Sequence, residues 1–159
     1  NPFPGSPVYS LGHRNPQGLA WDPAGRLFAA EHGPSAHDEV NQILPGRNYG
    51  WPEVQGRSGD GRYAEPILES ESDTWAPSGI AFLGHDLFVA GLRGQRLLRL
   101  TFTPDGSRVT RLSTLLDRAW GRLRDVVVGP DGALYVTTSN RDGRGSPASD
   151  DDRILKVTP

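Results

Sequence analysis

The sequence contains no cysteine, no methionine and no long hydrophobic run. The absence of cysteine excludes disulfides and thiol chemistry and removes the usual ligands of structural zinc. No apolar stretch has the length that a helix needs to span a bilayer. The formal net charge is only −2 over 159 residues, which gives no electrostatic basis for binding nucleic acid or an acidic membrane surface. The length suits one ordinary domain.

Glycine and proline are abundant instead, with 20 and 14 copies scattered along the chain. This composition predicts many short strands joined by turns, and no stretch has the sustained periodicity and caps of a long helix. An apolar strand, a turn, a second apolar strand and a third strand recur three times. The predicted strands are 16–21, 25–30 and 39–43; 77–82, 86–90 and 96–102; and 123–128, 132–136 and 153–157.

The three copies begin near residues 17, 78 and 123, a spacing of about 45 to 60 residues that is typical of β-propeller blades. One small sheet cannot bury both of its faces, whereas radially stacked sheets cover each other. The alternative is a β-sandwich with a chance likeness between hairpins. Because propellers need at least about four blades, three blades do not close a ring. Either the chain is part of a larger propeller or it closes by association, and we expect residues 1–159 to be the C-terminal half of a single propeller domain.

A dense polar run precedes the first strand, in Gly12–Trp21. Arg14, Asn15 and Gln17 carry hydrogen-bonding groups, and the proline among them restrains the backbone. This arrangement predicts a set of donors for an anion at the mouth of a β-element. The alternative is a loop whose polar side chains satisfy only their own backbone.

The segment 31–39 follows the second strand of the first repeat and contains Gly33–Pro34. A tight Gly-Pro turn can direct two successive carbonyls the same way, and hard cations such as calcium bind such oxygens together with carboxylates. Asp38 and Glu39 lie close enough in sequence to contribute. The alternative is an ordinary turn. The two histidines of this segment lack the spacing of a zinc site.

Tyr49 lies in a Gly- and Trp-containing loop, and its side chain either packs the loop onto the core or offers an oxygen to an ion. The acidic turn at 59–61 and the run Asp150–Asp152 are solvated in the ordinary case, although either could touch an ion.

Arg93, Arg122 and Arg124 each lie at an end of a predicted strand, as Arg14 does in the first repeat. Arg122 and Arg124 alternate about Leu123, so a strand places both on one face. Propellers bring such strand ends together around a central channel, where several guanidinium groups could bind one polycarboxylate bidentately. The alternative is surface ion pairing, which contributes little energy.

With these motifs together, the chain resembles the C-terminal half of the soluble pyrroloquinoline quinone (PQQ)-dependent aldose (glucose/sorbosone) dehydrogenases, which are six-bladed β-propellers. The resemblance covers nearly the whole chain, and its strength lies in six motifs that occur in order. They are Gly-His-Arg-Asn-Pro-Gln-Gly at 12–18, Glu-His-Gly-Pro at 31–34 with the acidic pair at 38–39, Asn-Tyr-Gly-Trp-Pro at 48–52, Trp-Ala-Pro-Ser-Gly at 75–79, Arg-Leu-Arg-Asp at 122–125 and Gly-Pro-Asp-Gly at 129–132.

The resemblance implies contacts with the quinone from Arg14, Asn15 and Gln17, and it gives Arg14 a catalytic role beside the carbonyl that receives the hydride. Thr74 is implied as a further hydrogen-bonding contact. The guanidinium groups that would meet the cofactor carboxylates are those of Arg93, Arg122 and Arg124; some relatives have a lysine at the position of Arg93.

The resemblance also implies two calcium sites. The backbone carbonyls of Gly33 and Pro34 would hold the calcium that polarises the cofactor. Glu39 and Tyr49 match residues of a second, structural calcium site.

The implied reaction is oxidation of the C1 hydroxyl of an aldose to the lactone, with electrons passed to an external acceptor and a periplasmic or secreted location for the protein. The general base of the family lies in the N-terminal half, and neither His13 nor His32 matches its motif. This chain is therefore expected to be inactive without that half. Two other functions stay open: a propeller that only binds, and a calcium-dependent propeller lactonase.

Overall fold

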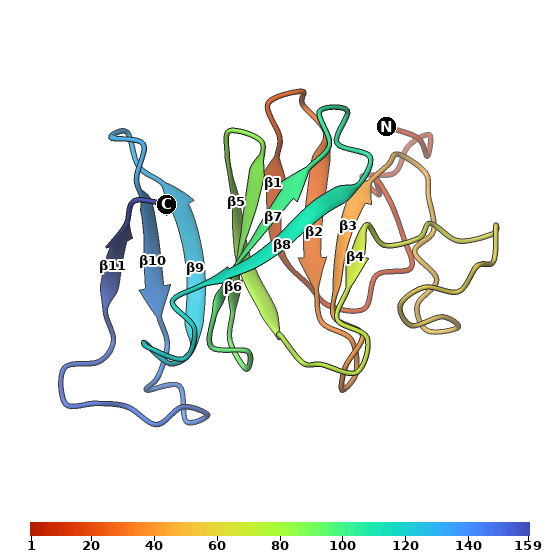
Figure 1. Cartoon of the computed structure of the whole chain (residues 1–159). Coiled ribbons are helices and arrows are strands. Elements are labelled where there is room, and N and C mark those ends of the chain that lie inside the picture. Colours follow the sequence, from red (N-terminus) through yellow and green to blue (C-terminus); the bar gives the residue numbers. More distant parts are fainter.

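The computed structural model describes all 159 residues and contains only strands, with no helix. Eleven strands form three antiparallel sheets (Figure 1). The first sheet has the order β1-β2-β3-β4, the second β5-β6-β7-β8 and the third β11-β10-β9. The strand bounds are β1 Pro16–Trp21, β2 Leu27–Glu31, β3 Glu39–Ile43, β4 Leu68–Glu69, β5 Pro77–Leu83, β6 Asp86–Gly91, β7 Leu97–Phe102, β8 Val109–Leu115, β9 Leu123–Val128, β10 Leu134–Thr138 and β11 Ile154–Val157.

The predicted threefold repeat is confirmed, and each of its nine strands is present with bounds that shift by at most two residues. Two fourth strands, β4 and β8, escaped the sequence pattern. β4 has only two residues, and β8 is an outer edge strand without a fully buried position, so neither has the apolar signature of a core strand.

Two apolar clusters hold the three sheets together. Between the first and second sheets, Phe28 lies edge-on to Phe82 and Phe102, with ring centroids 5.2 and 5.3 Å apart. Between the second and third sheets, Phe88 and Leu123 belong to a seven-residue cluster and are 1% and 0% exposed. Each such buried side chain contributes about 1.5–3 kcal/mol through removal of apolar area from water.

The innermost strands β1, β5 and β9 lie side by side, and the sheets spread outward from them like a fan (Figure 1). Glycine permits this close approach: a Cβ at Gly18 would collide with the Ser78 carbonyl, and one at Gly79 would collide with the Asp125 carboxylate. Three sheets fanned about their first strands are propeller blades, which excludes the β-sandwich alternative.

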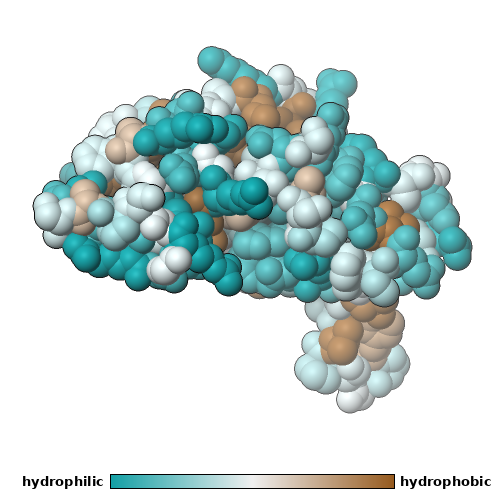
Figure 2. All heavy atoms as spheres, turned by 90° about the horizontal axis from the view of Figure 1, so that it is seen from below, coloured by the Kyte–Doolittle hydropathy of each residue, from teal (hydrophilic) through white to brown (hydrophobic).

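The fan has two edges of different kinds. The upper edge in Figure 1 carries the short turns β1–β2, β5–β6, β7–β8 and β9–β10. The lower edge carries the loops that follow β2, β6 and β10 and precede β5 and β9, most of which are longer. Viewed from below, the lower edge is mainly hydrophilic (Figure 2). The chain contains no helix of the length and apolarity that crossing a membrane requires.

Candidate functional site

A cleft of about 440 Å³ opens at the lower edge where loops of all three sheets meet. We call it the inner cleft. Its polar lining comes from five segments. They are the loop after β2, the segment before β5, the loop after β6, the loop before β9 and the loop after β10. The residues that matter below are Gly33, Pro34, Asp38, Thr74, Arg93, Arg122 and Arg144. The structure therefore brings together side chains and carbonyls that are up to 111 residues apart in sequence (Gly33 to Arg144).

The Gly33–Pro34 turn lines the inner cleft and also a smaller cavity on its other side. Neither carbonyl accepts a hydrogen bond from the chain, although both residues line the cleft. The turn is folded back so tightly that a Cβ at Gly33 would collide with the Ala36 carbonyl. Two unpartnered carbonyls held close together are suitable ligands for a hard divalent cation.

A buried carboxylate fixes this turn against the next sheet. Asp38 is 2% exposed and accepts hydrogen bonds from Gly33 N at 3.1 Å, Trp75 N at 2.7 Å and Ala76 N at 2.8 Å. The Thr74 hydroxyl donates to the Ser35 carbonyl at 2.7 Å and joins the same two segments again. The loop after β2 and the segment before β5 are thereby one unit.

The predicted arginine pair at the start of β9 shares a single carboxylate. Arg122 and Arg124 each donate to Asp142 Oδ2, at 2.9 and 3.2 Å. The backbone amide of Arg144 and the Arg122 guanidinium lower the pKa of Asp142 and keep it ionised. Arg122 is 7% exposed, whereas Arg93 is exposed and has no ion-pair partner in the chain. The inner cleft therefore has an excess of positive charge that suits an anionic ligand.

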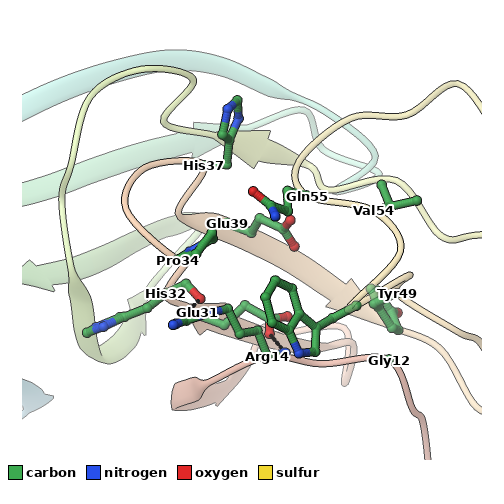
Figure 3. A pocket seen from close by; sticks show the side chains of 12 residues that line it. Gly12, Arg14, Glu31, His32, Pro34, His37, Glu39, Tyr49, Val54 and Gln55 are labelled. Carbon is green, nitrogen blue, oxygen red and sulfur yellow. Dashed lines mark hydrogen bonds between the residues drawn. The ribbon is translucent and has the colours of Figure 1, made fainter.

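Arg14 lies on the other side of the His32–Pro34 turn, around a small cavity of about 20 Å³ (Figure 3). Its guanidinium donates to the His32 carbonyl at 3.3 Å and lies 5.3 Å from the Trp51 ring centroid. Its backbone amide donates to Glu31 Oε2 at 3.0 Å. Arg14 is thus held directly against the His32–Pro34 turn, whose three residues line both this cavity and the inner cleft.

Glu31 organises this side of the site. It is 3% exposed, and its second oxygen contacts His13 Nδ1 and Asn41 Nδ2, both at 2.9 Å. His13 also stacks on Tyr49, with ring centroids 4.5 Å apart. One buried carboxylate therefore fixes the backbone that presents Arg14.

The small cavity also receives Glu39, which is predicted as a metal ligand together with Tyr49. Burial raises the pKa of Glu39, and the neighbouring carboxylates of Glu31 and Glu69 add to that effect. The Tyr49 hydroxyl is already used, because it donates to the Gln42 carbonyl at 2.6 Å and accepts from Leu44 N at 3.0 Å. The oxygen that Tyr49 has left for an ion is its backbone carbonyl.

Asn15 and Gln17 are the least constrained of the predicted contacts. The Gln17 amide donates to Asn15 Oδ1 at 2.7 Å, and the Asn15 carbonyl accepts from His32 N at 3.1 Å. Both side chains lie beside the turn but outside the lining of either cavity. Their predicted contact with a ligand stays a prediction.

The sequence did not single out Glu31 or Asp142 as site residues. It indicated Asp38 only as a carboxylate near the Gly33–Pro34 turn. The available signal was position: Glu31 ends a buried strand, where an unpaired carboxylate would be costly. Asp142 gave no such signal, because its loop has the composition of a solvated turn.

Comparison with known proteins gives one family. The family model described as glucose / sorbosone dehydrogenase matches residues 1–146. Among curated proteins, the aldose sugar dehydrogenase YliI of Escherichia coli K12 is 32% identical over 96% of this chain and 44% of its own length. Quinoprotein glucose dehydrogenase B of Acinetobacter calcoaceticus is 56% identical over 37% of this chain and 12% of its own length.

Two solved structures have the same fold over the whole chain. The PQQ-bound aldose sugar dehydrogenase of Streptomyces coelicolor is 48% identical with a TM-score of 0.92, covering 99% of this chain and 47% of its own. A putative glucose dehydrogenase of Thermus thermophilus is 54% identical with a TM-score of 0.91, covering 99% of this chain and 52% of its own. The chain thus spans about half the length of these relatives, and the predicted all-β propeller class is confirmed.

Proposed function

This chain belongs to the glucose/sorbosone dehydrogenase family, and we propose that it is the C-terminal half of an enzyme that oxidises the C1 hydroxyl of aldose sugars to lactones. The proposed cofactor is PQQ with calcium. The names of two relatives support PQQ: one structure is a PQQ-bound aldose sugar dehydrogenase, and one curated relative is a quinoprotein glucose dehydrogenase. Below, the parent protein means the full propeller that contains this chain.

The observation that carries the proposal is the donor set of the inner cleft. Gly33 and Pro34, whose carbonyls accept no hydrogen bond from the chain, line the same cleft as Arg93, Arg122 and Arg144. PQQ is a flat molecule with three carboxyl groups, so it needs clustered guanidinium groups, and its calcium needs oxygen ligands. The residues present fit both groups.

In this proposal Gly33 and Pro34 hold the calcium through their carbonyls, and Arg122 and Arg124 bind cofactor carboxylates, with Arg93 as a further contact. When bound, the quinone supplies the acceptor for the C1 hydride. The Asp142 carboxylate keeps Arg122 and Arg124 in one orientation before any ligand arrives, which lowers the cost of ordering them on binding.

Arg14 is the proposed catalytic residue of this chain. Its guanidinium is exposed but restrained by the His32 carbonyl and the Trp51 ring, so its donors have a fixed direction. A preorganised cation stabilises negative charge that develops during hydride transfer. Asn15, Gln17 and Thr74 are proposed to complete the hydrogen bonds to the cofactor.

The small cavity is proposed to hold a second, structural calcium through Glu39 and the Tyr49 carbonyl. The lining supports this proposal, because Glu31, Glu39 and Tyr49 all border the small cavity. Carboxylate and backbone carbonyl oxygens are the ligands that calcium prefers.

The chain supplies no residue for the general base, so the proposed reaction needs the N-terminal half. Two sheet faces have the apolar character that this half would cover. On the first sheet, Leu19 and Trp21 are 58% and 61% exposed; on the third, Val127 and Ile154 are 52% and 74% exposed. Each face resembles the buried face of an inner blade.

The parent protein, given calcium and PQQ, should reduce an external dye when aldoses are added. Dye reduction that depends on both additions supports the proposal. Cofactor binding without dye reduction would instead favour a propeller that only binds, and lactone hydrolysis without the quinone would favour a calcium-dependent lactonase.

A further inference from the structure

Four arginines lie in or beside the inner cleft, and their guanidinium groups are not equally occupied. Arg122 and Arg124 both donate to Asp142 Oδ2, at 2.9 and 3.2 Å. Arg93 and Arg144 also line the cleft, but both are exposed and neither guanidinium makes a hydrogen bond or ion pair with the chain. Arg144 uses only its backbone amide, which donates to Asp142 Oδ1 at 3.0 Å. Two of the four groups are thus held in place and two are free.

The acidic side chains of the cleft do not neutralise these four positive charges. Asp38 is 2% exposed and accepts hydrogen bonds from three backbone amides rather than from an arginine. Asp142 is a single carboxylate shared by two guanidinium groups. Asp73, in the segment before β5, pairs with Arg96 at 3.6 Å. Four cations against the carboxylates of Asp38 and Asp142 leave a surplus of two positive charges in this half of the site.

The cofactor of the proposed function removes only part of this surplus. PQQ brings three carboxylates and its calcium two positive charges, so together they add one negative charge. One positive charge of the cleft then remains. Arg14 adds another from the neighbouring turn, where its exposed guanidinium donates to the His32 carbonyl at 3.3 Å. The part of the loaded site that this chain supplies therefore stays cationic.

We propose that the electron acceptor of this enzyme is an anion, which the surplus positive charge draws to the inner cleft and which Arg144 contacts there. The inference rests on the proposed function and names the partner of the same site. An aldose is neutral and gains nothing from the field, whereas an anionic acceptor is steered to the cleft and associates about 10- to 1,000-fold faster. Arg144 is the arginine of the lining to which the proposed function assigns no cofactor carboxylate, so its guanidinium stays available.

The electron balance requires an acceptor in every turnover. Oxidation of one aldose to its lactone releases two electrons and two protons. With hexacyanoferrate(III) as the acceptor, two ions each take one electron and become hexacyanoferrate(II), while both protons pass to water. An anionic one-electron oxidant of this class therefore completes the reaction.

The test compares hexacyanoferrate(III), a trianion, with hexaammineruthenium(III), a trication, as acceptors for the reconstituted parent protein. At about 10 mM salt, Arg144→Glu should lower kcat/KM for hexacyanoferrate(III) at least fivefold and raise it for hexaammineruthenium(III). The two effects should vanish at about 1 M salt, where charges are screened beyond about 3 Å.

Arg111 is an exposed arginine on β8, so Arg111→Glu is the matched control, and it should change neither value by more than twofold. Both acceptors take electrons from the same cofactor, so poorer loading with PQQ would lower both rates alike. Equal changes for the two acceptors in Arg144→Glu, or no change for either, would overturn the inference.

A second readout needs no activity and separates this inference from the proposed function. Hexacyanocobaltate(III) has the charge and shape of hexacyanoferrate(III) but is not reduced by the enzyme. Calorimetric titration of the cofactor-free parent protein should show binding of this ion that weakens at least threefold in Arg144→Glu and is unchanged in Arg111→Glu. A protein that oxidises no aldose but shows this difference retains the anion site; equal binding by the two variants refutes it.

Discussion

The two edges of the fan use acidic residues in different ways. At the upper edge three aspartates close their own turns: Asp22 accepts from the amides of Ala24 and Arg26, and Asp131 accepts from Ala133 N. Asp105 does the same in the β7–β8 turn. These contacts span two to four residues, so none of them joins one sheet to another.

At the lower edge the acids join distant segments. Glu31 reaches back 17 residues to Arg14 N, Asp38 reaches forward 37 and 38 residues to the segment before β5, and Asp142 holds Arg122 across 20 residues. Of these contacts, those of Asp38 join the first sheet to the second, so this part of the lower edge exists only when the two sheets are assembled. In a binding site built from such contacts, the packing of the blades sets the positions of the side chains. Catalysis requires side chains to be positioned this closely.

The largest difference between the edges should appear on removal of Asp38. Asp38→Ala leaves three backbone amides, one of them buried, without their acceptor and should lower the unfolding free energy of the parent protein by about 3 kcal/mol. Urea unfolding followed by circular dichroism measures this. A loss below about 1 kcal/mol would mean that water replaces the carboxylate and that Asp38 does not join the sheets.

Glu31→Gln should have the next largest effect, about 2 kcal/mol, because one charged acceptor serves the Arg14 amide, His13 and Asn41. The Arg14 amide should also exchange its hydrogen faster than in the unmodified protein, as hydrogen exchange with mass spectrometry can record. Unchanged exchange at this loop would contradict the role given to Glu31.

Asp22→Asn tests the upper edge with a matched local contact. An amide keeps an acceptor for the turn but loses the ion pair with Arg26, so the expected loss is about 1 kcal/mol. PQQ affinity should stay within twofold, since the turn lies at the other edge. Weaker cofactor binding in Asp22→Asn would show that the edges are not independent.

The smallest effect should come from Asp131. Hydrogen bonds from Lys156 and Tyr135 lower the pKa of Asp131 to about 2, below its ordinary value of 3.8. The unfolded chain then binds the proton more tightly, so the stabilisation present above about pH 4 is lost as the pH falls towards about 2. Asp131→Asn should flatten the stability profile in that interval, and an equally steep profile in the variant would refute this assignment.

The same contrast explains what the sequence could predict. The upper turns were readable, because Asp22–Gly25 and Gly129–Gly132 contain their own turn chemistry. The strands followed from apolar pattern, except β4 and β8 at outer edges. At the lower edge, the local sequence indicated the Gly33–Pro34 turn and the arginines as site residues. It did not indicate which carboxylates hold them in place.

The partners at the lower edge were hidden for a physical reason. Asp38 and Asp142 bind groups as far as 38 and 20 residues away, and nothing in their neighbours encodes that distance. The use of the Tyr49 hydroxyl within its own loop was hidden likewise, because it depends on how the loop packs on β3. The expected ligand follows from the resemblance to a family. The arrangement of the side chains around it depends on the packing of the blades.

The most direct measurement is equilibrium binding of PQQ to the cofactor-free parent protein, with and without calcium, for the unmodified protein, Arg122→Gln and the control Arg111→Gln. We predict binding that requires calcium, that weakens at least tenfold in Arg122→Gln and that is unchanged in Arg111→Gln. Calcium-independent binding, or equal affinities for the two variants, would contradict a quinone site in the inner cleft.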